Sequence, residues 1–94
     1  MSLVPITNLK NLPKICGIYK VLDDNNNVLY IGQAKNIYQR WKNGHHKMNE
    51  ILSRCGANAY IESVQVPGWL LNRAENSAIS FYQPPLNRKT PPVV

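Results

Sequence analysis

The first half of the chain alternates short apolar runs with turn-forming residues. Residues 15–22 (ICGIYKVL) and 28–32 (VLYIG) are apolar and bounded by turn residues, so they predict two strands. Residues 23–27 (DDNNN) between them are the strongest turn signal, because Asp and Asn tolerate left-handed backbone and bond to their own main chain. The pattern predicts a β-hairpin, preceded by an irregular or lightly structured lead-in over residues 1–14, which contain two prolines.

Helical signals dominate the second half. Asn36 can cap a helix that starts at Ile37, and Gly56 and a Pro-Pro pair at 84–85 are suitable helix stops. The expected elements are a helix from residue 37, a helix over 45–54, a strand over 59–66 and a helix over 69–82. The order ββααβα predicts a single α+β domain with a small three-stranded, antiparallel or mixed sheet flanked by helices.

One charged side chain interrupts the apolar face of the last predicted helix. At 100° per residue, Glu75 falls inside a stripe formed by Leu71, Ala74, Ala78, Ile79, Phe81 and Tyr82. A carboxylate there is costly unless it is paired or binds a cation. It could form an ion pair with an arginine such as Arg40 or reach the edge of the stripe, or it could hold a hard divalent cation. The pattern leaves these interpretations open.

Two tyrosines on the predicted hairpin could act together, depending on the strand register. If Leu22 pairs with Asn27, Tyr19 lies opposite Tyr30 and both rings leave the same face. If Leu22 pairs with Val28, the rings point to opposite faces. The sequence leaves both registers open.

The composition of the chain indicates a partner with negative charge. The 94 residues include 11 Lys and Arg against 5 Asp and Glu, for a net charge of +6, and 44% are hydrophobic. Such a chain is globular and attracts polyanions, nucleic acid among them. The two cysteines and the His45–His46 pair lack the paired spacing of a zinc site. No run approaches 18 apolar residues, so we expect a soluble, cytoplasmic protein without membrane contact.

Five ordered elements of the sequence resemble the GIY-YIG endonuclease family. They are residues 17–19 (GIY), residues 30–32 (YIG), Arg40, Glu75 and Asn87, and Tyr30 lies eleven positions after Tyr19. A single tripeptide would be a weak signal, whereas five ordered elements are specific. The similarity covers about residues 15–88, which leaves a Pro-rich tail over 89–94.

The resemblance implies hydrolysis of phosphodiester bonds with one divalent cation, Mg²⁺ or Mn²⁺. Glu75 would bind the metal, and Tyr19 would lie beside the attacking water as general base. Tyr30 would position the water or the phosphate, Arg40 would stabilise the charged phosphate, and Asn87 would brace the site. A metal and an arginine can neutralise a phosphodiester. A tyrosine base needs nearby cations to lower its pKa of about 10; Lys20, Lys35 and Arg40 are the candidates.

Two positions depart from the family pattern. Many members carry a histidine or tyrosine four residues after the arginine, where this chain has Gly44 followed by His45 and His46. We expect His45 to take that place. The alternatives are that His46 does so, or that the function is absent and both histidines are exposed at a helix start. Some members also have a lysine after YIG, where this chain has Gln33, whose amide can still bind a phosphate.

The candidate nucleic-acid contacts are spread along the chain: Lys20, Gln33, Lys35, Lys42, Lys47 and Arg88. Phosphate contacts position a duplex but do not read its sequence. We therefore expect weakly specific or structure-dependent cleavage of nucleic acid, DNA in preference to RNA, or reliance on a partner protein or a homodimer for specificity. The alternative is a catalytically silent nucleic-acid-binding module of the same fold.

Overall fold

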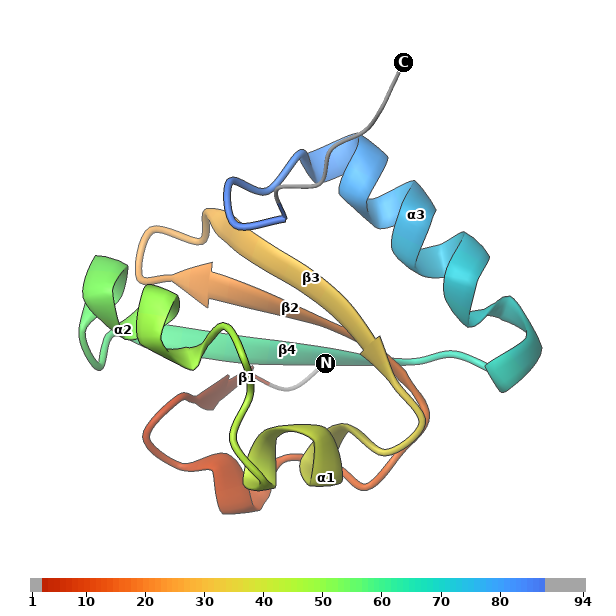
Figure 1. Ribbon diagram of the computed structural model, residues 1–94, viewed down its shortest axis with the longest axis horizontal. Helices are drawn as coiled ribbons and strands as arrows, with labels where there is room; N and C mark the ends of the chain where they lie inside the picture. Colours follow the sequence, from red (N-terminus) through yellow and green to blue (C-terminus); the bar gives the residue numbers. More distant parts are fainter. Residues whose placement is uncertain (1–2, 88–94) are drawn as a thin grey trace.

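A computed structural model describes residues 3–87 and contains one antiparallel sheet with helices on both of its faces (Figure 1). The strand order is β1-β4-β2-β3. In chain order the elements are β1 (Leu3–Pro5), the 3-10 turn η1 (Leu9–Asn11), β2 (Gly17–Asp23), β3 (Val28–Ala34), α1 (Ile37–Lys42), α2 (Met48–Cys55), β4 (Ala59–Gln65), the 3-10 turn η2 (Gly68–Leu70) and α3 (Leu71–Tyr82). The predicted α+β class is confirmed. None of the helices in this part of the chain is long and apolar enough to cross a membrane.

The sheet has four strands, so the expectation of three was wrong. The lead-in contains one short strand and one 3-10 turn within residues 3–14. The additional strand, β1, pairs antiparallel with β4 and aligns the buried Val4 with Ile61. β1 has only three residues and ends in Pro5, so it leaves no periodic pattern in the sequence. Proline is tolerated there because β1 is an edge strand.

A β-bulge sets the hairpin register, which matches neither of the two alternatives drawn from the sequence. Leu22 pairs with Val28, but Val21 pairs with Tyr30, so Leu29 is an extra residue on β3. Beyond the bulge, Tyr19 pairs with Gly32. Because side chains alternate along a strand, the bulge returns Tyr19 and Tyr30 to the same face.

Two apolar clusters hold the helices against the sheet. The larger one packs α1 and α2 against one face and includes Tyr19, Val21, Tyr30, Trp41 and Ile61. The smaller one packs the start of α3 against the other face through Ile18, Val66 and Leu71. In Figure 1, α3 lies on the opposite side of β3 from α1 and α2. β3 therefore lies between α3 and the two other helices, so side chains from both sides can meet at this strand.

The start of α2 and the exposure of Phe81 differ from the prediction. α2 begins at Met48 rather than residue 45, so His45 and His46 lie in the preceding turn. Phe81 is 80% exposed, although it was expected on the buried stripe of the last helix. The stripe that packs is narrower, with Leu71, Ala74 and Ala78, and Phe81 instead packs edge-on against the ring of Tyr82.

Candidate active site

Tyr19 is buried at the centre of the candidate site and shares a hydrogen bond with His45. Its side chain is 1% exposed, and its Oη lies 2.7 Å from Nε2 of His45. The Tyr30 ring centroid is 6.3 Å away, and Trp41 packs edge-on at 5.4 Å. The Tyr19 side chain on β2 is therefore fixed by the rings of Tyr30, Trp41 and His45, and it lies on the face of the sheet that it shares with Tyr30.

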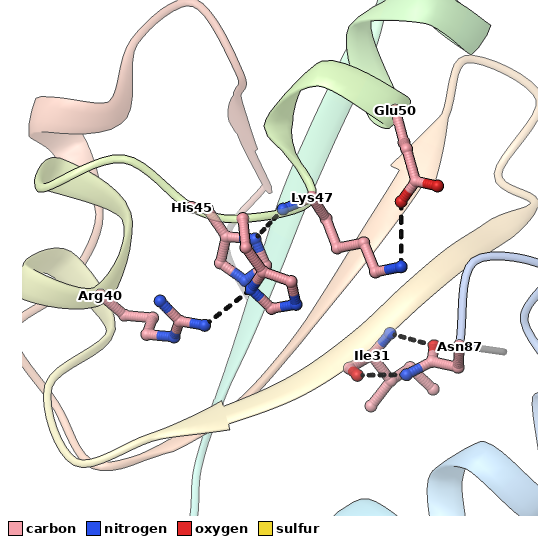
Figure 2. Close-up of polar contacts among 7 residues, drawn as sticks. Ile31, Arg40, His45, Lys47, Glu50 and Asn87 are labelled. Atoms are coloured by element: carbon pink, nitrogen blue, oxygen red, sulfur yellow. Dashed lines mark hydrogen bonds and ion pairs between the residues drawn. The ribbon is translucent and has the colours of Figure 1, made fainter. Parts of the chain in front are cut away.

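The direction of the His45 hydrogen bonds follows from the main chain. The backbone N–H of Lys47 donates to Nδ1 of His45 at 3.0 Å (Figure 2). A neutral imidazole that accepts at Nδ1 carries its proton on Nε2. His45 therefore donates to Tyr19, and the proton of the tyrosine hydroxyl points away from His45.

The surroundings of His45 keep its ring neutral. The imidazole is 4% exposed and stacks on Trp41 at 4.0 Å. Burial lowers the pKa of His45 to about 3, with smaller contributions from the positive charge of Arg40 and from His46 and Lys47. A buried neutral histidine acts as a fixed hydrogen-bond donor to Tyr19.

We expect acidification to destabilise the fold through His45. Its pKa is 6.5 in the unfolded chain and about 3 in the folded one. Between these values the unfolded state binds one more proton, so the free energy of unfolding falls by about 1.4 kcal/mol for each pH unit lost. Urea unfolding from about pH 6.5 to about pH 5 measures this slope above the range in which carboxyl groups titrate. His45→Gln should flatten it and His46→Gln should keep most of it. A slope that His45→Gln leaves unchanged would exclude this origin.

Opposite charges act on both tyrosines from two helices. Burial raises the pKa of Tyr19, and Tyr30 and Glu75 raise it further, while the guanidinium of Arg40 lowers it. Burial and Glu75 also raise the pKa of Tyr30, which Arg40 again lowers. Arg40 of α1 and Glu75 of α3 are therefore both close enough to the two hydroxyls to act electrostatically on them. The structure brings these four residues together.

Glu75 is half-buried on α3 and is fixed by an amide from β3. Its Oε1 accepts a hydrogen bond of 2.6 Å from Nε2 of Gln33, and the same nitrogen donates to Oδ1 of Asn72 at 2.8 Å. Within residues 3–87, the ion pairs of the structure are Lys20–Glu62 and Lys47–Glu50, so Glu75 does not pair with Arg40. Gln33 thus holds the carboxylate by a hydrogen bond, and its expected phosphate contact stays a prediction.

The donor set around Glu75 fits a hard divalent cation. No group of three or more His, Cys, Asp or Glu side chains that could hold a metal occurs in the described part of the chain. Oε2 of Glu75 has no hydrogen-bond donor among residues 3–87. Mg²⁺ uses one or two carboxylates and takes its remaining ligands from water and substrate phosphates.

Asn87 acts on the backbone of the YIG segment. Its Oδ1 accepts from the N–H of Ile31 at 2.8 Å, and its Nδ2 donates to the carbonyl of Ile31, also at 2.8 Å (Figure 2). The N–H of Leu86 donates to the carbonyl of Leu29. Residues 86–87 therefore bond to the otherwise free edge of β3 next to Tyr30.

Asn87→Ala is expected to lower the free energy of unfolding by about 1–3 kcal/mol, because it leaves both polar groups of Ile31 without these partners. The exposed Asn58 is a matched control, since its backbone rather than its side chain bonds to Cys55. Urea unfolding of Asn87→Ala and Asn58→Ala measures the difference. Equal stabilities would contradict a bracing role for Asn87.

The predicted cationic contacts do not all lie near the site. Lys20 is placed on the opposite face of the sheet from Tyr19, because neighbouring side chains on a strand alternate. It forms an ion pair of 3.2 Å with Glu62 and lies over the Tyr82 ring at 5.0 Å. It is therefore not one of the cations that act on the Tyr19 hydroxyl, and the causes of the Tyr19 pKa shift do not include it.

Three of the other predicted contacts, all lysines, have defined surroundings, and Arg88 lies outside the described residues. Lys35 is exposed and lines an open hollow with Arg40. Lys42 lies over the ring of Tyr38 at 5.8 Å. Lys47 pairs with Glu50 at 2.9 Å and lies over the Tyr30 ring at 5.9 Å. Arg88 and the tail over 89–94 lie outside the described part of the chain.

Sequence reasoning missed three contacts in this site. They are the main-chain bond from Lys47 to His45, the amide bond from Gln33 to Glu75 and the stacking of His45 on Trp41. Ile37 and Trp41 lie one helical turn apart in the sequence, a spacing that indicates only a buried helix face. No periodic signal marks a contact between a turn and a helix.

Comparison with known proteins gives the same fold and the same motifs. A family model described as the GIY-YIG catalytic domain matches residues 15–83. The UvrABC system protein C of Helicobacter pylori is 49% identical over 37 residues, which are 39% of this chain and 6% of that protein. The protein of the same name from Rickettsia felis is 30% identical over 87 residues, which are 86% of this chain and 13% of that protein. The chain thus spans only a small part of these relatives.

Solved structures extend the likeness to the fold. The GIY-YIG N-terminal endonuclease domain of UvrC from Thermotoga maritima superposes with a TM-score of 0.69 at 21% identity, over 86% of this chain and 91% of that one. That structure is of a point mutant bound to its catalytic divalent cation, and a second point mutant bound to the cation matches equally well. With a family match that covers residues 15–83, the chain belongs to the GIY-YIG catalytic domain family.

Proposed function

We propose that this chain is an endonuclease that hydrolyses phosphodiester bonds in DNA with the help of one divalent cation. The observation that carries this proposal is the convergence of Tyr19, Tyr30, Arg40 and Glu75, whose charges and hydroxyls interact although they come from four different elements. The cation in the Thermotoga maritima domain and the excision-system relatives support the same reaction and DNA as the substrate.

Glu75 would hold the cation, Mg²⁺ or Mn²⁺, through the oxygen that Gln33 leaves without a donor. When bound, the cation would neutralise phosphate charge and stabilise the oxygen that leaves. Gln33 would keep the carboxylate in one orientation during this step. Fixed ligands cost no reorganisation when charge develops.

Arg40 would contact the scissile phosphate from the other side of the site. A guanidinium is always charged and can donate two parallel hydrogen bonds to phosphate oxygens. Arg40 also lowers the pKa of both tyrosines. One residue would therefore stabilise charge on the phosphate and on a nearby tyrosinate.

Tyr19 would receive the proton of the attacking water. Burial opposes its ionisation, so the charged form needs specific partners. His45 supplies one of them, because its Nε2–H donates to the tyrosine oxygen. A charge-assisted hydrogen bond is stronger than a neutral one, so this contact favours the tyrosinate. Tyr30, braced through Asn87 and Ile31, would position the water or the phosphate.

The exposed cations would hold the backbone of the nucleic acid without reading its bases. We therefore propose cleavage that depends weakly on sequence or depends on DNA structure, with a partner protein or a second copy as the source of any specificity. Incubation of the chain with supercoiled, flapped and branched DNA, and with RNA of matched sequence, tests the proposal when Mg²⁺ is present or removed. Binding without cleavage under all these conditions would favour the catalytically silent module.

A further inference from the structure

His46 is an exposed histidine that contacts the phosphate-binding candidate Arg40. Its Nδ1 lies 2.9 Å from Nη2 of Arg40. His46 does not share in the hydrogen bond to Tyr19, which is made by His45. The two adjacent histidines thus contact two different residues of the candidate site.

The chemistry of the pair determines which group donates. An arginine has only donors, so Nδ1 of His46 must be the acceptor. The neutral ring then carries its proton on Nε2. The bond to His46 uses one N–H of the guanidinium, and Arg40 also hydrogen-bonds to the Tyr19 side chain. A guanidinium has five N–H donors, so others remain to meet the oxygens of a phosphate.

The ring of His46 is held in place although it is exposed. It stacks on the ring of His45 at 4.6 Å, and His45 stacks in turn on Trp41 of α1 at 4.0 Å. The Tyr30 ring lies edge-on to the ring of His46, with 6.1 Å between the two ring centroids. An acceptor fixed by a column of stacked rings restricts the rotamers of the long arginine side chain, whose entropy would otherwise oppose a defined contact.

We propose that His46 is a positioning residue, which accepts a hydrogen bond from Arg40 and thereby holds the guanidinium in the orientation that binds the scissile phosphate. This inference rests on the proposed nuclease function and adds a residue to it. A guanidinium held in one orientation should support faster cleavage than a mobile one, because a displacement of about 1 Å at such a group can lower the rate about a hundredfold.

The proposal makes the orientation of Arg40 dependent on pH. A protonated His46 has an N–H at both ring nitrogens and cannot accept from a guanidinium. The charged groups that face the ring are Arg40 from α1, Lys47 from the turn and Glu50 from α2, besides the neutral His45 and Tyr30. Burial, Arg40 and Lys47 lower the pKa of His46, while Glu50 raises it. The contact should therefore persist at neutral pH and be lost on acidification.

Three substitutions at His46 distinguish the effect of its hydrogen-bond acceptor from the effect of its ring stacking. His46→Asn keeps an acceptor near the position of Nδ1 but does not titrate, His46→Phe keeps the stacking without an acceptor, and His46→Ala removes both. At about pH 8, we expect kcat/KM for DNA cleavage to fall about tenfold or more in the Phe and Ala variants and to stay within about threefold of the parent in the Asn variant. Ser53→Ala, on the exposed side of α2, is the matched surface control.

The pH profile tests the titration directly. Because the pKa of His46 lies below the ordinary histidine value of about 6.5, the parent chain should lose activity as the pH falls below that value, and the Asn variant should lose less of it. Equal activity of the Ala variant and the parent would overturn the proposal. Parallel losses in the Asn and Ala variants, with unchanged circular dichroism, would also overturn it.

A measurement on the free protein separates this proposal from the nuclease assignment. In nitrogen NMR spectra, one Arg40 Hη should exchange slowly in the parent chain and in His46→Asn, and rapidly in His46→Ala and in the parent at acid pH. A parent chain that shows this signal but cleaves nothing would refute the nuclease function while keeping the contact. A parent chain that cleaves DNA but lacks the signal would refute the role of His46 alone.

Discussion

Replacing Glu75 with glutamine is expected to lower the rate of DNA cleavage by about a thousandfold, the largest effect of any change considered. The variant keeps the size of the side chain and an oxygen that can accept from Gln33, so the local structure should persist. It removes the negative charge of the carboxylate that we propose as the ligand of the divalent cation. Single-turnover cleavage of supercoiled DNA in saturating Mg²⁺ measures the loss.

Glu62→Gln is the matched control for this change. Glu62 is also half-buried, but it lies on β4 and pairs with Lys20 on the face of the sheet away from Tyr19. We expect this variant to cleave DNA at close to the parental rate. A Glu75→Gln variant that retains full, Mg²⁺-dependent activity would remove Glu75 from the mechanism.

Gly32→Ala is expected to have the second-largest effect, because it displaces Tyr19. A Cβ at Gly32 would overlap the Oη, Cζ and Cε1 atoms of the tyrosine. The ring cannot move aside easily, since Trp41 and His45 pack edge-on against it at 5.4 and 5.5 Å. Overpacking of this kind costs about 1–3 kcal/mol of stability. We also expect cleavage to fall by about a hundredfold, because the hydroxyl leaves the hydrogen bond with His45.

Gly68→Ala provides the comparison, because a Cβ at Gly68 meets no atom within 4 Å. Thermal unfolding and cleavage rates of the two alanine variants, measured side by side, test whether the space above Gly32 is needed. If Gly32→Ala were as stable and as active as Gly68→Ala, the close packing of Tyr19 on Gly32 would not be needed for stability or for cleavage.

Most of the fold could be predicted from local patterns. The hairpin, the cap at Asn36 and the last helix all follow from apolar periodicity and turn chemistry, and the structure confirms these elements. Strand β1 could not be predicted, because a three-residue edge strand is stabilised by pairing with β4, far away in the sequence. The bulge at Leu29 is equally non-local, since β2 and β3 can pair in several registers that differ by one residue.

The candidate site was predictable in its residue types and not in its contacts. Glu75 stands out because a carboxylate interrupts an apolar stripe, and the structure places it beside Gln33. The placement of Lys20 depends on strand alternation together with the pairing partner on β4, and its expected position near Tyr19 was wrong. The separate partners of His45 and His46 depend on a turn whose backbone donates to one ring while the other ring meets α1.

The dependence of single-turnover DNA cleavage on Mg²⁺ concentration tests the central claim most directly. One cation held by one carboxylate predicts no cleavage by the parent chain in excess EDTA, and a rate that rises to a plateau along a single-site curve as Mg²⁺ is added. Cleavage that continues unchanged in EDTA, or its absence at every Mg²⁺ concentration on DNA that the chain binds, would contradict the account.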